Sequence, residues 1–177
     1  MVRLLLARND VNPDKPDNKG LTPLSQACFC GHGGVVRLLL SRGDVNPDGP
    51  GNGSLTPLIC ASLYGQEEVV RLLLARDGVD PNKPDGDGHT PLSQASIFGH
   101  EGVVRLLLGR GDINPDKPDN NGRTPLLKAS FCGHEGVVRL LLARNDVNPD
   151  KPDNEGQTPL QVASIHGCRE IVRLLQP

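Results

Sequence analysis

A repeat of 34 residues constrains this chain more than any other feature of its sequence. The tripeptide Thr-Pro-Leu recurs at that spacing without slippage, beginning at Thr22, Thr56, Thr90, Thr124 and Thr158. A second phrase, Val-Val-Arg-Leu-Leu-Leu in the interior copies, keeps the same period, with its arginine at Arg3, Arg37, Arg71, Arg105, Arg139 and Arg173. Two independent markers in one register predict a solenoid, in which each unit stacks only on its neighbours.

Each unit is predicted to contain two short helices and a loop. Thr22 suits the N-cap of the first helix, and Pro23 suits its first turn, where a missing N–H costs nothing. Gly31 is expected to end this helix, and a second helix is predicted from about Val35 to Arg42. Residues 11–20 hold two prolines and therefore predict an extended, turn-rich finger.

Composition excludes several classes of protein. The 177 residues carry a net charge of −2 and only four aromatic side chains, which argues against a nucleic-acid-binding groove. No apolar run reaches the ~20 residues of a membrane span, and the N-terminus does not have the pattern of a secretory signal. The five cysteines are interpreted as reduced thiols of a cytoplasmic protein.

The repeat motif resembles that of a known family. Thr-Pro-Leu-x-x-Ala, with Gly31-His32 nine residues after Thr22, is similar to the ankyrin repeat. Tetratricopeptide repeats share the period, but the proline-rich finger and the missing Trp, Gly and Tyr positions exclude them. The resemblance implies an all-α ankyrin-repeat solenoid of helix-turn-helix units with protruding, hairpin-like fingers. The finger phrases also resemble ankyrin arrays of filamentous fungi, which often belong to NLR-like proteins.

The register divides the chain into one expected domain spanning residues 1–177. It comprises a half repeat (1–16), four full repeats (17–50, 51–84, 85–118 and 119–152) and a C-terminal capping repeat (153–177). The capping repeat is the more polar end, whereas the N-terminal helix is expected to expose Leu4, Leu5 and Leu6. The chain is therefore interpreted as a piece of a longer protein.

One departure from the family pattern concerns histidine. The resemblance implies a His directly after Thr-Pro-Leu that bonds between neighbouring repeats. The chain instead holds Ser25, Ile59, Ser93, Leu127 and Gln161 there. We expect packing to replace this contact. The histidines that begin the link between the two helices are expected to form hydrogen bonds at that loop; these are His32, His100 and His134.

Columns that vary between repeats predict a binding surface. Two columns near the end of the first helix hold all four aromatic residues, and the helical angle points Phe29 away from the core side of Leu24 and Ala27. Two further variable columns lie at the finger tips. The predicted partner-binding residues are Phe29, Cys30, Leu63, Tyr64, Ile97, Phe98, Phe131, Cys132, Lys19, Leu21, Leu55, Asp87, His89, Asn121, Arg123 and Gln157. The alternative is that the Phe29 column packs beneath the fingers as satellite core.

Other patterns have structural explanations. The arginine column of the second helix is expected to form i,i+4 pairs, Glu67–Arg71, Glu101–Arg105 and Glu135–Arg139, on a solvated face. The finger aspartates suit turns, with a weak divalent-ion site as the alternative. Cys28-x-Cys30-x-His32 does not predict zinc, because Cys28 is expected to face the core and Cys30 to face outward.

No set of residues predicts catalysis, a metal site or a cofactor. The expected function is that of a protein-protein interaction scaffold that binds a protein partner through its concave face and finger tips, without nucleic acid or membrane. A monomer is expected. The alternative is a structural spacer or a module that self-associates through the uncapped N-terminal helix.

Overall fold

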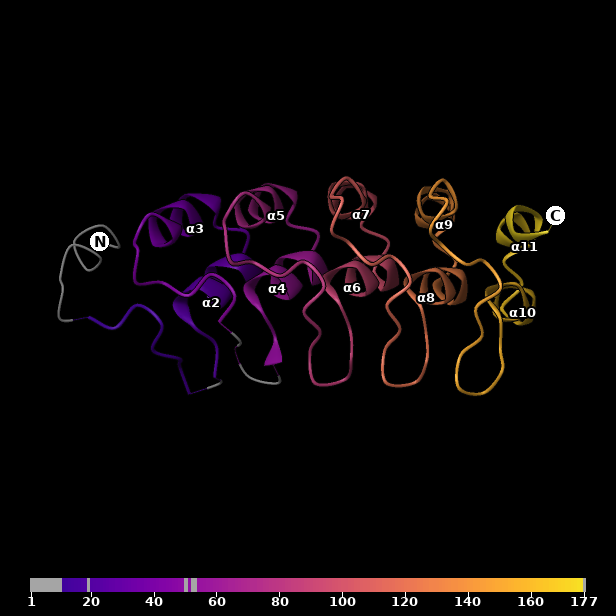
Figure 1. Ribbon diagram of the computed structural model, residues 1–177, viewed down its shortest axis with the longest axis horizontal. Coiled ribbons are helices and arrows are strands. Elements are labelled where there is room, and N and C mark those ends of the chain that lie inside the picture. Colours follow the sequence, from indigo (N-terminus) through magenta and orange to yellow (C-terminus); the bar gives the residue numbers. More distant parts are fainter. Residues whose placement is uncertain (1–10, 19, 50, 52–53, 177) are drawn as a thin grey trace.

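The computed structural model describes residues 11–18, 20–49, 51 and 54–176. These residues form ten helices and no strand, and the helices alternate along the chain between two rows (Figure 1). The first helices of the repeats are α2 (Pro23–Phe29), α4 (Pro57–Leu63), α6 (Pro91–Ile97), α8 (Pro125–Cys132) and α10 (Pro159–Ile165). The second helices are α3 (Gly33–Leu40), α5 (Glu67–Leu74), α7 (Glu101–Leu108), α9 (Glu135–Leu142) and α11 (Arg169–Leu175). The predicted all-α solenoid is confirmed.

The first helices begin as the Thr-Pro-Leu motif predicts. Each threonine is an N-cap whose hydroxyl accepts a hydrogen bond from the N–H three residues later, as Thr124 Oγ1 does from Leu127 N at 3.2 Å. Soon after each helix, a glycine takes the left-handed conformation, which ends the helix and turns the chain. Gly31 is the first of these, with φ +70°. The second helices begin two residues earlier than predicted, at Gly33 rather than Val35.

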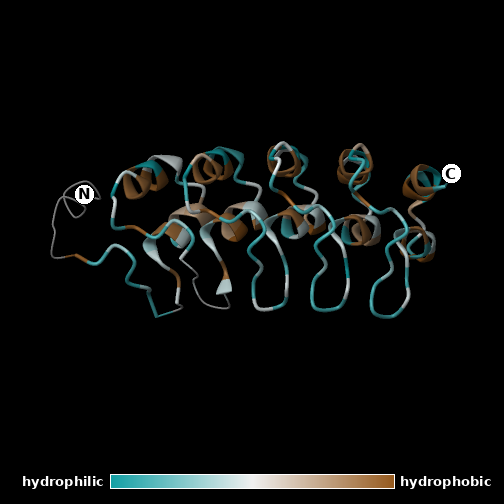
Figure 2. Cartoon of the chain, viewed as in Figure 1, coloured by the Kyte–Doolittle hydropathy of each residue, from teal (hydrophilic) through white to brown (hydrophobic). Residues whose placement is uncertain are grey.

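The core lies between and within the two rows of helices. The leucine of every Thr-Pro-Leu up to Leu126 is fully buried, as are Val36 and its equivalents in the second helices. Figure 2 shows hydrophobic residues concentrated in both rows of helices and hydrophilic residues along the loops below them. These loops are the fingers, which we define as residues 11–21, 43–55, 77–89, 111–123 and 145–157. The first helices lie between the fingers and the second helices (Figure 1).

An aspartate organises the turn in the fingers 77–89, 111–123 and 145–157, whereas the finger 43–55 holds Gly51 at this position. Asp119 Oδ1 accepts hydrogen bonds from the N–H groups of Asn121 (2.9 Å) and Arg123 (2.8 Å), and Asp85 and Asp153 do the same in their fingers. The finger then closes through the backbone, where Asp119 N donates to Arg123 O at 3.1 Å. This is the turn chemistry expected of the finger aspartates.

Hydrogen bonds join neighbouring repeats, so the expectation that packing alone would do so is wrong. Three kinds of long side chain donate to backbone carbonyls of the preceding repeat. They are His100 and His134 to Leu63 O (3.0 Å) and Ile97 O (2.8 Å); Lys83, Lys117 and Lys151 to Asp48 O, Asn82 O and Asp116 O (2.9–3.0 Å); and Arg110 and Arg144 to Leu74 O (2.8 Å) and Leu108 O (2.6 Å). We call this set the carbonyl ladder.

None of the described helices combines the length and the apolarity that a membrane span requires.

Candidate functional site

The aromatic side chains predicted to bind a partner lie on the surface. Phe29 is 38% exposed, Tyr64 45%, Phe131 49% and Phe98 51%. They stand at the ends of the first helices α2, α4, α6 and α8, and each repeat from 17–50 to 119–152 therefore contributes one ring. The exposure argues against the alternative that these rings form a satellite core beneath the fingers. We call them, with Cys30, Leu63, Ile97 and Cys132, the aromatic strip.

Neighbouring repeats contact one another within this strip. The rings of Phe29 and Tyr64 lie 4.3 Å apart between centroids, and Phe131 lies 4.2 Å from the ring of His166 in the last repeat. Both pairs are tilted rather than parallel, a favourable arrangement for aromatic rings. Leu63 and Ile97 are half-buried between these positions, and the two cysteines are exposed. The strip is therefore a partly packed surface rather than a row of isolated side chains.

The predicted finger residues divide by exposure. Asp87 and Asn121 are exposed, whereas Leu21, Leu55, His89, Arg123 and Gln157 are half-buried. Lys19 lies outside the described residues. Because the second group is half-buried, only part of each of these residues is available for contact.

One pocket brings together six of the predicted residues. It has a volume of about 210 Å³ and lies between the repeats 85–118 and 119–152. Its walls are His89 and Ile97 from one repeat and, from the next, Asp119, Asn121, Arg123, Leu127, Lys128, Phe131 and Cys132. The aromatic strip and the fingers therefore meet here in a single cavity.

A buried ion pair forms part of the pocket wall, and the sequence analysis missed it. Lys128 Nζ lies 2.9 Å from Asp119 Oδ2, and the two side chains are only 6% and 2% exposed. Burial lowers the pKa of Lys128, although Asp119 partly opposes this. Burial also raises the pKa of Asp119, but the contact with Lys128 and hydrogen bonds from the finger backbone outweigh it, and the net pKa is below the usual value. The signal in the sequence was a lysine where other repeats hold Gln26, Cys60, Gln94 and Val162.

A group of potential metal ligands stands beside this pocket. Asp85, Asp87 and His89 bring one ligand atom each within 4.8 Å of one another. However, Asp85 Oδ1 already accepts the N–H groups of Asp87 and His89, and Asp85 Oδ2 accepts a bond from Gln94 Nε2 at 3.2 Å. These contacts explain the cluster as part of a finger turn.

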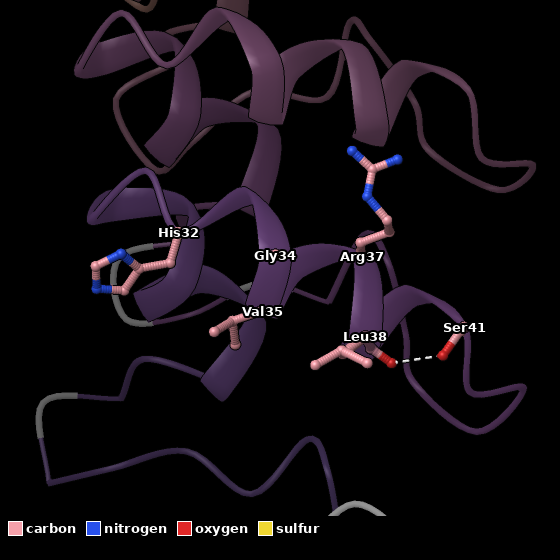
Figure 3. A pocket seen from close by; sticks show the side chains of 6 residues that line it. All are labelled: His32, Gly34, Val35, Arg37, Leu38 and Ser41. Carbon is pink, nitrogen blue, oxygen red and sulfur yellow. Dashed lines mark hydrogen bonds between the residues drawn. The ribbon is translucent and has the colours of Figure 1, made fainter. Parts of the chain in front are cut away.

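A second apolar surface flanks α3 (Figure 3). Val35 and Leu38 lie on the same side of this helix, while Arg37 points away from them. Ser41 Oγ donates a hydrogen bond to Leu38 O at 2.7 Å, which fixes the end of the helix. The Leu4, Leu5 and Leu6 predicted to be exposed lie outside the described residues.

The arginines of the second helices pair with carboxylates, as expected of a solvated face. Arg71 lies 3.9 Å from Glu67, and Arg139 lies 2.6 Å from Glu135. The predicted third pair, Glu101–Arg105, is not among the ion pairs of the described residues. The Glu101 carboxylate lies against Gly136 of the next repeat instead.

The cysteines do not converge on a zinc site. Cys28 is fully buried and Cys30 is exposed, so the two thiols face opposite sides of their helix, as predicted. Burial raises the pKa of Cys28, and it raises that of Cys60 to about 11. Both buried thiols are therefore protonated core side chains.

Five stacked helix pairs, joined repeat to repeat and projecting one loop each, define a helical solenoid repeat protein. A family model described as ankyrin repeats (three copies) matches residues 1–85, 49–117, 77–153 and 111–177. The chain therefore belongs to the ankyrin-repeat family, as its motif predicted. A search of curated proteins found no match to this sequence.

Membership of this family carries a general function. Ankyrin repeats are generally protein–protein interaction modules, and the family is typically non-catalytic.

Proposed function

We propose that this chain is a protein-binding module whose contact surface is the aromatic strip together with the adjoining finger side chains. The observation that carries the proposal is the exposure of one aromatic ring per repeat over four consecutive repeats, between 38% and 51%. Contiguous exposed apolar side chains on a protein surface mark interaction sites. Aromatic residues are also the commonest energetic centres of protein interfaces.

The finger residues extend this surface with polar groups. Asp87, Asn121, Arg123 and Gln157 differ in charge and size while their fingers keep one fold. Variation on a constant scaffold suits selection among partners, because the frame stays fixed while the contacts change. Ligands of this module are therefore expected to touch several repeats at once along the concave face.

The double substitution Tyr64→Arg with Phe98→Arg tests the proposal. Both rings are about half exposed, so the variant is expected to fold with a melting temperature within a few degrees of the wild type. Loss of two interface centres at about 2 kcal/mol each lowers partner affinity by roughly 100-fold or more. The measurement is affinity capture from a cell extract on the immobilised chain, with mass spectrometry of the captured proteins.

A matched control places two arginines elsewhere. Ala75→Arg with Ala143→Arg adds the same charge at exposed positions that end α5 and α9. This control is expected to capture the same proteins as the wild type. Equal capture by the Tyr64/Phe98 variant would place the binding surface elsewhere, and a large fall in its melting temperature would mean that the rings pack as core.

The apolar surface that flanks α3 favours a second candidate function. Its apolar residues Val35 and Leu38 are half-buried, which suits self-association in a structural spacer. Size-exclusion chromatography with light scattering separates the two candidates: a dimer that depends on concentration supports self-association, and a monomer supports partner binding alone. The finger phrases further support a place for the module in a larger, cytoplasmic, NLR-like protein.

A further inference from the structure

The pocket between the repeats 85–118 and 119–152 has a size that limits what it can hold. Its volume of about 210 Å³ is below the roughly 300–1,000 Å³ of sites for small molecules and cofactors. Ile97, Leu127 and Phe131 provide the apolar part of its lining, and the polar part, which we call the polar wall, includes Asp119, Arg123 and Lys128. A cavity of this size and composition suits one side chain of a bound protein segment.

The acceptors in the polar wall are already used. Asp119 Oδ1 accepts two backbone N–H groups of its finger, and Asp119 Oδ2 pairs with Lys128 and lies 3.6 Å from His89 Nε2. The neighbouring carboxylates of Asp85 and Asp153 accept two finger N–H groups each in the same way. A ligand that enters the pocket therefore meets no carboxylate oxygen that lacks a partner.

The polar wall also contains two donor side chains, Lys128 and Arg123. Lys128 Nζ is buried and makes no hydrogen bond within the described residues; its contact with Asp119 is an ion pair. Arg123 Nε lies 3.6 Å from Asp153 Oδ2, and the side chain of Arg123 is 41% exposed. The two Nη groups of Arg123 have no acceptor in the part of the chain that the structure describes. Among the side chains that line the pocket, Arg123 and Lys128 carry two positive charges against the one negative charge of Asp119, so the polar wall suits an anion.

This combination occurs once among the repeats. The Lys128 column otherwise holds Gln26, Cys60, Gln94 and Val162, and the Arg123 column holds Leu21, Leu55, His89 and Gln157. Only the repeat 119–152 holds both a lysine and an arginine at these two positions, and the exposed ring of Phe131 belongs to the same repeat. The pocket therefore marks one position along the solenoid as different from the others.

We propose that this pocket binds a carboxylate side chain, Asp or Glu, of the partner, with an apolar residue of the same segment packed on Phe131. Arg123 donates its Nη groups to the carboxylate in the two-pronged geometry that guanidinium favours, and Lys128 supplies a second positive group beneath it. The inference rests on the proposed protein-binding function and adds the chemistry of the partner and the register at which it docks.

The test uses peptides selected on the full chain from a random twelve-residue display library. Enriched peptides are expected to carry Asp or Glu beside an apolar residue. Replacing that acid by its amide in a synthetic peptide should weaken binding to the wild type at least 10-fold. On the variant Arg123→Gln the same replacement should weaken binding by a clearly smaller factor than on the wild type, because the carboxylate has lost one of its two positive partners.

Matched variants keep the experiment independent of folding. Lys128→Gln introduces the residue that Gln94 provides in the preceding repeat, where it bonds to the finger carboxylate of Asp85. This variant should fold and lose at least 10-fold in affinity. Should Lys128→Gln unfold, Arg123→Gln alone decides the question, since its side chain is partly exposed. Arg71→Gln, on the second-helix face, controls for the lost charge and should bind as the wild type does.

Several results would overturn the inference. Enriched peptides without an acidic residue, or acidic peptides that bind Arg123→Gln and Lys128→Gln as tightly as the wild type, exclude the carboxylate site. If such peptides still lose binding to the Tyr64/Phe98 double variant, the proposed function stands and only the pocket inference fails. A folded wild type that enriches no peptide contradicts both.

Discussion

Asp119 and Asp85 occupy equivalent positions but have different partners. Asp85 Oδ2 accepts a bond from the neutral amide of Gln94, whereas Asp119 Oδ2 faces the charged amine of Lys128. The amide of Gln94 donates to Asp85 Oδ2 without burying a positive charge. The lysine leaves a buried ammonium with unused donors, which is expensive unless another acceptor arrives. A single substitution in one column thus turns a structural contact into a candidate recognition element.

The Asp119 carboxylate should make stability depend on acid pH. Its pKa in the folded chain is below the ordinary value of 3.8, so the unfolded chain takes up the proton first as the pH falls. Its contribution is therefore fully present above the unfolded pKa and disappears as the pH falls through the folded pKa. We expect the free energy of unfolding to fall less between about pH 5 and about pH 2 in Asp119→Asn than in the wild type. Urea unfolding at each pH measures this, and parallel curves would contradict it.

At the scale of the element, the second helices α7 and α9 are tied to the repeat before them through their N-cap histidines, His100 and His134. His134 occupies that position in α9 but does not cap its own helix; its ring Nε2 instead donates to Ile97 O, at the end of α6. One residue therefore links the start of one helix to the end of another in the preceding repeat.

Removing this link should weaken the solenoid by a measurable amount. His134→Ala is expected to lower the free energy of unfolding by about 1 kcal/mol, the net contribution of a typical hydrogen bond. His32→Ala is the control, because the ring of His32 is exposed and makes no hydrogen bond within the described residues. Urea denaturation of both variants gives the values. Equal losses in the two would mean that the hydrogen bond of His134 contributes nothing.

The helices were largely predictable from the sequence, and the start of α3 shows where the prediction failed. Thr-Pro-Leu located every first helix, because an N-cap followed by proline is a local signal that needs no tertiary information. The predicted start of α3 at Val35 leaves Gly33 and Gly34 outside the helix, which agrees with the low helix propensity of glycine. The helix nevertheless begins at Gly33. Packing of α3 on α2 and α5 outweighs the propensity of two residues.

Over the part of the molecule that the structure describes, the main contacts between helices run between neighbours. Each first helix packs on the first helices beside it and on its own second helix, and the second helices form an equivalent row. Repeats of this kind contribute their own stability plus the energy of their interfaces. Damage in one repeat should therefore remain local.

Leu126→Ala tests this behaviour. Leu126 is fully buried in α8, and its truncation is expected to cost about 2–5 kcal/mol. Hydrogen exchange should increase most in α8 to α11, while α4 and α5 keep their protection. Ile165→Ala, at a residue 70% exposed in α10, should leave exchange unchanged. A uniform increase over all helices would show that the array unfolds as one unit.

The candidate site could be predicted only in part from the sequence. The 100° step of a helix was enough to place Phe29 and Phe131 on the surface, because direction on a short helix depends on spacing alone. The pocket was not predictable in this way, since its walls come from two fingers, from α6 and from α8, which are adjacent only after stacking. The carbonyl ladder was also missed, because its acceptors are backbone atoms that every sequence possesses.

Because the acceptors of the carbonyl ladder are backbone atoms, such a chain can gain or lose whole repeats. The donors of the carbonyl ladder recognise main-chain oxygens, which a duplicated unit carries whatever its side chains are. A copy of residues 85–118 inserted after residue 118 would present the same oxygens to Lys151 and His134, and its own Lys and His would find theirs in the original. Gene-level expansion or loss of whole units then preserves the joints while adding or removing one ring and one loop, so copy number becomes a variable that selection can adjust separately from stability.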